Sequence, residues 1–406
     1  MILVVIAMSG GFATAWMWRT NAAKEELPPG VSPREYELAR ESFELKYGRK
    51  ADHLDVLSWL AEWLLARQRP ADAVACFAAI PTSHPEYGRM ARYQQGRTLL
   101  DLHRAVEAEQ QFRELIVLEE ASPSIKPEFL IDARQRLRHI FEVELRFEER
   151  HQLLREVIER SEADTFEAVA GCFPSLLRWN GAEATLWLEE FHAADPTSPR
   201  LNVALGRYLT GQGKPEEARK ILETVVREQP RDLSALAALI ACLREVDDPE
   251  ELSRVFATLP PRSPEDPWLL LIQRGTDAIQ NGRPQEAVAA YEQLLQQDRT
   301  SAEAWQGLAQ AARLLDDTPR RTKALEMATA LGRIQNSLGK TIREASDPNS
   351  FLDVAELCAE ASLNREGSIM TECARKLGPE TDRLRAAVRL FQEQLSIEHA
   401  PPSAAK

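Results

Sequence analysis

The sequence predicts an all-α protein, built as an α-solenoid of stacked two-helix repeats. Small and apolar residues recur at a fixed period, with Ala218, Leu252 and Ala287 holding the same place in successive repeats, 34 and 35 residues apart. Of the 406 residues, 44% are hydrophobic and 28% are charged, close to the averages of soluble proteins. A single compact core would be unusual at this length, whereas a solenoid has no such limit because each repeat contacts only its neighbours.

Each repeat has the pattern of two antiparallel helices. In residues 201–230, Gly206 is the small residue of the first helix, Gly213 marks the turn and Ala218 is the small residue of the second helix. Small residues allow two helices to approach closely, and a large apolar residue fills the space beside the crossing. One pair cannot bury its own apolar face, so neighbouring pairs must stack. The predicted structural positions are Gly96, Ala108, Ala184, Gly206, Ala218, Pro230, Gly275 and Ala287.

The pattern resembles the tetratricopeptide repeat, because small and large residues recur in register as well as with an apolar period. The resemblance implies a right-handed superhelix and a repeat array over residues 34–332. Within residues 302–332, the second helix, around Ala324, Leu325 and Ala328, is out of register. The predicted units lie near residues 54–85, 89–120, 131–161, 165–196, 199–230, 233–264, 268–299 and 302–332.

Two parts of the chain depart from the repeat pattern. The unit at 131–161 is degenerate, because Arg150 stands where a small residue is usual. Residues 333–395 keep helical periodicity, with a hairpin-like segment from Phe351 to Leu377, and are predicted to form a degenerate helical repeat or cap. Residues 396–406 are predicted to be a disordered tail.

The N-terminus has the features of a membrane anchor. Residues 1–18 contain no charged side chain and would span about 27 Å as a helix, enough for a bilayer. Trp16 and Trp18 lie where an interfacial aromatic belt is expected, and Arg19 follows them. We therefore expect a transmembrane helix, followed by a Pro/Gly spacer at residues 19–33.

Two alternatives to an uncleaved anchor remain open. Ala13 and Ala15 form a small-residue site for cleavage of a signal peptide, although no basic region precedes the apolar run. An apolar extension that does not enter the membrane is the second alternative. The basic residues after the apolar run predict cytoplasmic repeats, whereas an analogy to anchored repeat proteins of bacteria favours repeats on the exported side of the bacterial inner membrane. We expect the exported side.

The sequence lacks the motifs of catalytic, cofactor and metal sites. It contains no G-x-S-x-G, no phosphate loop and no G-x-G-x-x-G, and its seven histidines show no metal-ligand spacing. Its five cysteines include no C-x-x-C and are predicted to be buried, with a disulfide between Cys358 and Cys373 as the alternative in an exported protein. The net charge of −13 argues against nucleic acid as a partner. We therefore expect a protein that is not an enzyme and binds no cofactor, metal or nucleic acid.

The concave groove of the solenoid is the expected binding surface, because first helices line it. Five residues lie on first helices, away from the small-residue stripe, and combine aromatic rings with positive charge. They suit a partner segment with an apolar centre and acidic flanks, while packing between repeats is the alternative role for each residue. The candidates are Tyr93, Arg97, His139, Phe173 and Arg207.

These features predict a membrane-tethered scaffold that holds a protein or peptide partner in its groove. One alternative is an accessory subunit that positions a catalytic partner in a membrane enzyme or a cofactor-assembly complex. Another is a structural spacer in the cell envelope.

Overall fold

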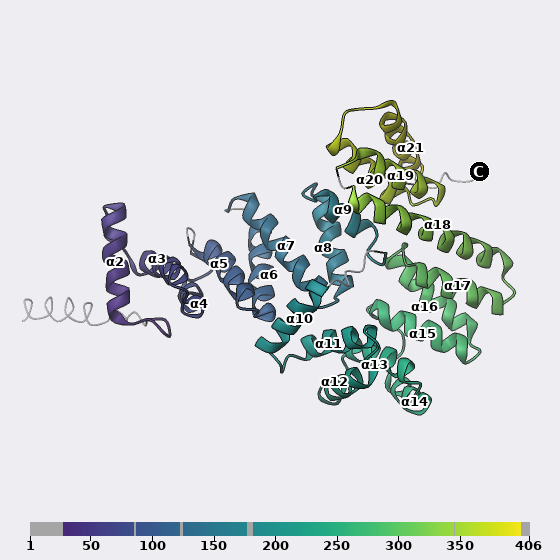
Figure 1. The fold of residues 1–406 in the computed structure, drawn as a ribbon, viewed down its shortest axis with the longest axis horizontal. Helices are drawn as coiled ribbons and strands as arrows, with labels where there is room; N and C mark the ends of the chain where they lie inside the picture. Colours follow the sequence, from purple (N-terminus) through teal and green to yellow (C-terminus); the bar gives the residue numbers. More distant parts are fainter. Residues whose placement is uncertain (1–26, 85–86, 122–124, 177–181, 345, 399–406) are drawn as a thin grey trace, which may run out of the picture. The chain divides into compact units, whose positions relative to one another are not determined.

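The computed structural model describes residues 27–84, 87–121, 125–176, 182–344 and 346–398. Within these ranges every regular element is an α-helix, from α2 to α21 (Figure 1). Helices that follow one another in sequence pack side by side, as in α5 on α6, α15 on α16 and α17 on α18. The predicted all-α solenoid is therefore confirmed.

The chain divides into two compact units, residues 1–134 and 135–406. Helix α7 crosses the boundary between them. In the first unit, each helix packs on the next from α2 to α6. The bounds are α2 Pro33–Tyr47, α3 His53–Ala66, α4 Pro70–Ala79, α5 Gly88–Asp101, α6 Ala105–Ala121 and α7 Pro127–Val143.

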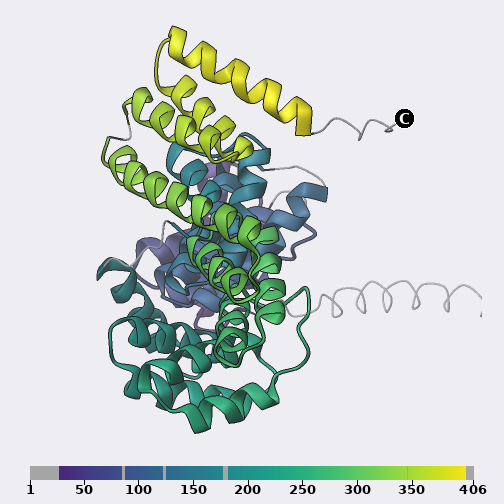
Figure 2. The same cartoon turned by 90° about the vertical axis from the view of Figure 1, so that its right-hand side faces the viewer.

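The second unit contains the longer run of helix pairs. Its helices stack in sequence order from α10 to α13 and again from α15 to α21, and α9 also packs against α20 (Figures 1 and 2). The bounds are α8 Phe147–Glu159, α9 Thr165–Cys172, α10 Ala182–Ala194, α11 Pro199–Gly211, α12 Pro215–Glu228, α13 Leu233–Val246, α14 Pro249–Thr258, α15 Trp268–Gln280, α16 Pro284–Gln297, α17 Ala302–Leu314, α18 Thr318–Arg343, α19 Pro348–Glu360, α20 Asn364–Leu377 and α21 Asp382–Glu398.

Close helix crossings explain the small residues of the repeat. A Cβ atom at Gly206 would lie 2.5 Å from Cγ of Leu222, and one at Gly275 would lie 2.5 Å from Cζ of Tyr291. The ring of Tyr291 also leaves no room for a side chain at Gly307 of the next first helix, where a Cβ atom would lie 2.2 Å from the ring. One large side chain thus fills the space beside two neighbouring crossings.

The other structural positions of the repeat have different environments. Gly96 meets Phe112 in the same way, with a Cβ atom 2.7 Å from the ring. Ala108, Ala218 and Ala287 are fully buried in second helices. Pro230 is exposed after α12, and Ala184 lies on α10 with its side chain outside the described residues.

Arg150 is accommodated in the core at the position of a small residue. Its side chain is 2% exposed, and its Nη2 donates a hydrogen bond to the carbonyl of Pro174 at 3.0 Å. Its Nη1 lies 4.0 Å from the carboxylate of Glu142, and its guanidinium lies over the ring of Phe147. Burial lowers the pKa of Arg150 from its usual value.

Helix α18 differs from the expected division at residue 332. It runs unbroken through Thr318–Arg343, so the end of the predicted array falls inside one helix (Figure 2). Gly332 is an isolated glycine within the helix, with open space around it. A single glycine is tolerated in a helix, and no proline lies nearby, so α18 does not end there.

The described part of the predicted spacer packs on the first repeat. Leu27 and Val31 contact the buried cluster of α2 to α4, and Arg69 donates a hydrogen bond to the carbonyl of Gly30 at 2.7 Å. Gly30 has a φ of 84°, in the left-handed region that glycine adopts without strain. Ser32 then caps α2 through the backbone N–H of Glu35. Residues 27–32 are therefore part of the folded unit.

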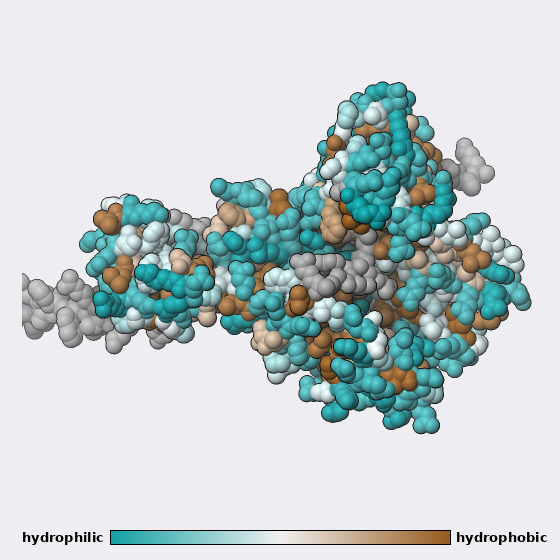
Figure 3. Space-filling view, viewed as in Figure 1, coloured by the Kyte–Doolittle hydropathy of each residue, from teal (hydrophilic) through white to brown (hydrophobic). Residues whose placement is uncertain are grey.

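The predicted anchor at residues 1–18 lies outside the described residues. In the part of the chain that the structure describes, no helix is long and apolar enough to cross a membrane. Polar residues cover most of the face in Figure 3, and apolar residues occur there in small separate patches.

Candidate functional site

In the first unit, Tyr93 packs between helices, and half-buried Arg97 lies beside it on α5. Tyr93 is 4% exposed, and its hydroxyl donates a hydrogen bond to Asp132 at 2.9 Å. Its ring lies 5.0 Å from that of Phe129, centroid to centroid, and the guanidinium of Arg97 lies over it at 5.6 Å. These contacts join α5 to α7, so Tyr93 offers no surface to a partner in this conformation.

In the second unit, His139 is half-buried and Phe173 is enclosed. The ring of His139 meets that of Trp187 edge to face, with centroids 5.0 Å apart. Burial and two neighbouring arginines lower the pKa of His139 to about 4, so the ring is neutral at pH 7. Phe173, which follows α9, is fully buried and cannot contact a partner in this conformation.

Arg207 projects from α11 onto the turn between α7 and α8. Its Nη1 donates a hydrogen bond to the carbonyl of Leu145 at 2.6 Å, and its guanidinium lies over the ring of Phe147 at 5.4 Å. The predicted track therefore divides into separate environments, two residues in the first unit and three in the second, each engaged by its own neighbours.

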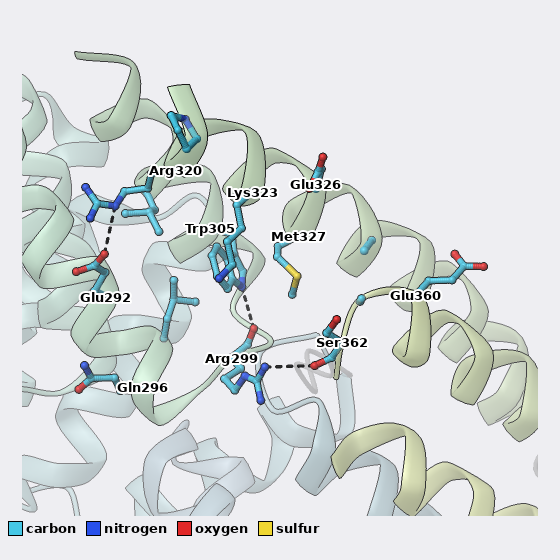
Figure 4. Close-up of a pocket in the computed structure, with 15 residues that line it drawn as sticks. Glu292, Gln296, Arg299, Trp305, Arg320, Lys323, Glu326, Met327, Glu360 and Ser362 are labelled. Carbon is cyan, nitrogen blue, oxygen red and sulfur yellow. Dashed lines mark hydrogen bonds and ion pairs between the residues drawn. The ribbon is translucent and has the colours of Figure 1, made fainter. Parts of the chain in front are cut away.

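An open groove lies elsewhere in the second unit. It has a volume of about 910 Å³ and is bounded by α16, α17, α18 and the residues that follow α19 (Figure 4). Leu295 of α16 and Leu308 of α17 form a buried apolar floor. Trp305 of α17 and Met327 of α18 are partly exposed and point into the groove. We call this feature the α18 groove.

The rim of the α18 groove carries charge. Trp305 Nε1 donates a hydrogen bond to the carbonyl of Arg299 at 2.9 Å, and Arg299 in turn donates to the carbonyl of Ser362 at 3.3 Å. Arg320 forms an ion pair with Glu292 at 3.4 Å. Lys323 is exposed, and among the described residues neither Lys323 nor Arg299 forms an ion pair. The rim thus carries both signs of charge around the apolar floor, with Arg299, Arg320 and Lys323 beside Glu292, Glu326 and Glu360.

One feature of the sequence coincides with the α18 groove. The second helix of unit 302–332 is out of register with the repeat, and α18, which contains Ala324 and Met327, extends well past the length of a repeat helix.

Neither a metal centre nor a disulfide occurs in the described part of the chain. No group of histidine, cysteine or carboxylate side chains there has the arrangement to hold a metal ion. Cys358 and Cys373 are both free and buried, and burial raises the pKa of Cys373 to about 11. Such thiols are poor nucleophiles because the thiolate is the reactive form.

Comparisons with known proteins identify the same repeat. Residues 180–243 and 265–311 each match a family model described as tetratricopeptide repeat. No curated protein matches the sequence.

Solved structures give low similarity over most of the chain. One is a tetratricopeptide repeat protein from Parabacteroides merdae, with 12% identity, coverage of 75% of this chain and 98% of that chain, and a TM-score of 0.29. Another is the tetratricopeptide repeat domain of P58(IPK), with 15% identity, coverage of 86% and 100%, and a TM-score of 0.28. The Cut9–Hcn1 hetero-tetramer gives 13% identity, coverage of 88% and 68%, and a TM-score of 0.35. Residues 180–243 and 265–311 are therefore similar to the tetratricopeptide repeat, and the all-α solenoid agrees with that similarity.

Proposed function

We propose that this protein is a non-catalytic scaffold that holds a segment of a protein partner in the α18 groove. The observation that carries the proposal is the combination of an open cavity of about 910 Å³ with an apolar floor and two cations that form no ion pair in the described residues. Half-exposed Trp305 and Met327 would anchor an apolar side chain of the partner, since aromatic residues supply much of the affinity at interfaces. Arg299 and Lys323 would select acidic residues beside that anchor.

We further propose that residues 1–18 tether the scaffold to a membrane, with the repeats on the exported side of a bacterial inner membrane. The uncharged length of this segment and its interfacial tryptophans support the tether. An accessory subunit of a membrane enzyme or cofactor-assembly complex is the second candidate, because a tethered scaffold would also serve to position a catalytic partner.

Pull-down of full-length protein solubilised in detergent, with quantitative mass spectrometry, tests the proposal. Partner recovery should fall at least tenfold for the double variant Met327→Ala with Lys323→Glu. Leu325→Ala is the matched control, since Leu325 lies on the same helix, is 47% exposed and does not line the groove. Equal recovery with all three proteins would overturn the α18 groove as the binding site. An enzyme subunit recovered in stoichiometric amount would favour the accessory-subunit alternative.

A further inference from the structure

The turn between α7 and α8 contacts α11 and α15, two helices that lie far away in the sequence. We define the inner turn as residues 144–148, which include the first two residues of α8, and the receiving face as Arg200 and Arg207 of α11 together with Trp268 of α15. All belong to the second unit. They share no residue with the lining of the α18 groove.

Two arginines of α11 bind the start of the inner turn. Arg200 forms an ion pair with Glu144 at 2.8 Å, and the side chain of Glu144 is fully buried. Arg207 donates a hydrogen bond to the carbonyl of Leu145 and covers the ring of Phe147. Leu145 has a φ of 55°, a left-handed conformation that is unfavourable for a leucine. The bond from Arg207 therefore holds a strained residue in place.

The end of the inner turn caps a helix that lacks a cap of its own. Helix α15 begins after Pro267, which provides no side-chain cap. The carboxylate of Glu148, which lies 120 residues earlier, instead accepts the backbone N–H of Trp268 at 2.7 Å. A negative charge at a helix N-terminus is favourable. Arg207 and this N–H both favour the charged form of Glu148, although burial raises its pKa overall.

The receiving face thus contacts a defined set of groups in the chain itself. Phe147 packs against the cluster around Trp268, and the ring of His151 lies 5.6 Å from that of Trp268. An aromatic ring is held directly before a carboxylate, and a second carboxylate lies three residues before the ring. The two arginines and the N-terminus of α15, whose cap is Glu148, provide complementary charge.

We propose that the receiving face is a second recognition site, for partner segments that present an aromatic residue followed by an acidic one, and that the inner turn occupies it until such a segment displaces it. This inference is independent of binding at the α18 groove. It explains why Arg207, on the expected binding surface, contacts the protein's own chain. Because the inner turn must be displaced, the apparent affinity for a partner segment depends on the fraction of molecules in which the turn has left the receiving face.

A labelled synthetic peptide of residues 143–151, VELRFEERH, provides the probe. Fluorescence anisotropy would measure its binding to the full-length protein and to the variant Phe147→Ala, in which the inner turn loses its aromatic anchor. We expect the variant to bind the peptide with a Kd at least tenfold lower than that of the wild type. A control peptide with alanine at the positions of Phe147 and Glu148 should bind neither protein. Adding Arg200→Ala and Arg207→Ala should abolish binding of the original peptide.

Failure of the folded variant to bind the peptide would overturn the proposal. If Phe147→Ala lowers the melting temperature strongly, hydrogen exchange of the wild-type protein tests instead whether the inner turn can leave the receiving face. A displaceable turn should let residues 144–148 and the amide of Trp268 exchange faster than the buried core of α16 and α17. Exchange of all these amides only through global unfolding would show that the turn is an integral part of the core, and would also overturn the proposal.

Discussion

Gly206 shows how little space remains where the two helices of a repeat cross. Its missing side chain allows Leu222 to lie where a Cβ atom would be 2.5 Å from Cγ. Leu222 is fully buried, and its neighbours Ala218 and Val225 are buried as well. Retreat from an added side chain would therefore disturb the surrounding core.

Gly206→Leu should lower the free energy of unfolding by about 1–3 kcal/mol or more, because overpacking forces side chains and backbone to shift. Gly211→Leu is the matched control on the same helix, since nothing lies within 4 Å of a Cβ atom at Gly211. Urea denaturation followed by circular dichroism measures both. Equal midpoints for the two variants would show that the crossing is not close-packed at Gly206.

His139 predicts a specific pH dependence of stability. The unfolded chain binds a proton on an ordinary histidine below pH 6.5, whereas folded His139 does so only at about pH 4. The unfolded state thus binds more protons between these values, so stability falls as the pH drops from 6.5 to 4. His139→Gln should weaken this fall.

The measurement is urea denaturation of both proteins at pH 7, 6, 5 and 4.5. The stability of the wild type relative to His139→Gln should decrease as the pH decreases. His151, whose pKa is also lowered to about 4 by burial, remains in both proteins and preserves part of the dependence. A constant difference across this range would contradict the prediction.

At this scale the sequence predicted packing better than binding. Gly206 and Gly275 have small side chains for a reason that recurs along the chain, so their role follows from the pattern alone. Helical position places Tyr93 and Phe173 on the groove side, but exposure depends on which distant helix covers a residue, and the pattern of one repeat does not contain that information. The burial of Arg150 also does not follow from the pattern of one repeat, since the carbonyl of Pro174 that accepts its hydrogen bond follows a different helix.

Helix α18 is longer than the repeat period predicts, and α21 continues to Glu398, past the predicted start of the tail at residue 396. The repeat period suggests an end near residue 332, whereas α18 continues to Arg343. Leu331, Ile334 and Leu338 are fully buried and follow a helical spacing, so burial of one continuous face sustains the helix.

Gly332→Ala should therefore raise the free energy of unfolding by about 0.5–1 kcal/mol, because alanine is favoured over glycine within a helix. A Cβ atom at Gly332 meets nothing within 4 Å, so no clash offsets the gain. Gly307→Ala is the opposing control, since its Cβ atom would meet Tyr291 at 2.2 Å and should destabilise the protein. A Gly332→Ala variant less stable than the wild type would indicate a break in α18 at that point.

For the whole molecule, the sequence predicted the class of fold but not the course of the array. Local residues dictate each helix pair, so the all-α solenoid follows from the period. The pairing of Glu148 with Trp268 and the contact of α9 with α20 join residues more than a hundred positions apart. Small rotations between successive repeats accumulate over such distances, and no single repeat determines them.

The link between the N-terminal segment and the first repeat gives a test that combines fold and location. Because Leu27 and Val31 pack on the first repeat and Ser32 caps α2, the folded unit begins before residue 33.

Deletion of residues 1–26 should leave a stable helical protein in the soluble fraction, whereas full-length protein should fractionate with membranes. Deletion of residues 1–32 should also release the protein but lower its melting temperature, since it removes buried apolar contacts and a cap worth about 1 kcal/mol. Membrane fractionation and thermal melts of the three proteins separate the two effects. Full-length, uncleaved protein in the soluble fraction would contradict the tether, and equal melting temperatures for the two deletions would contradict the packing of residues 27–32.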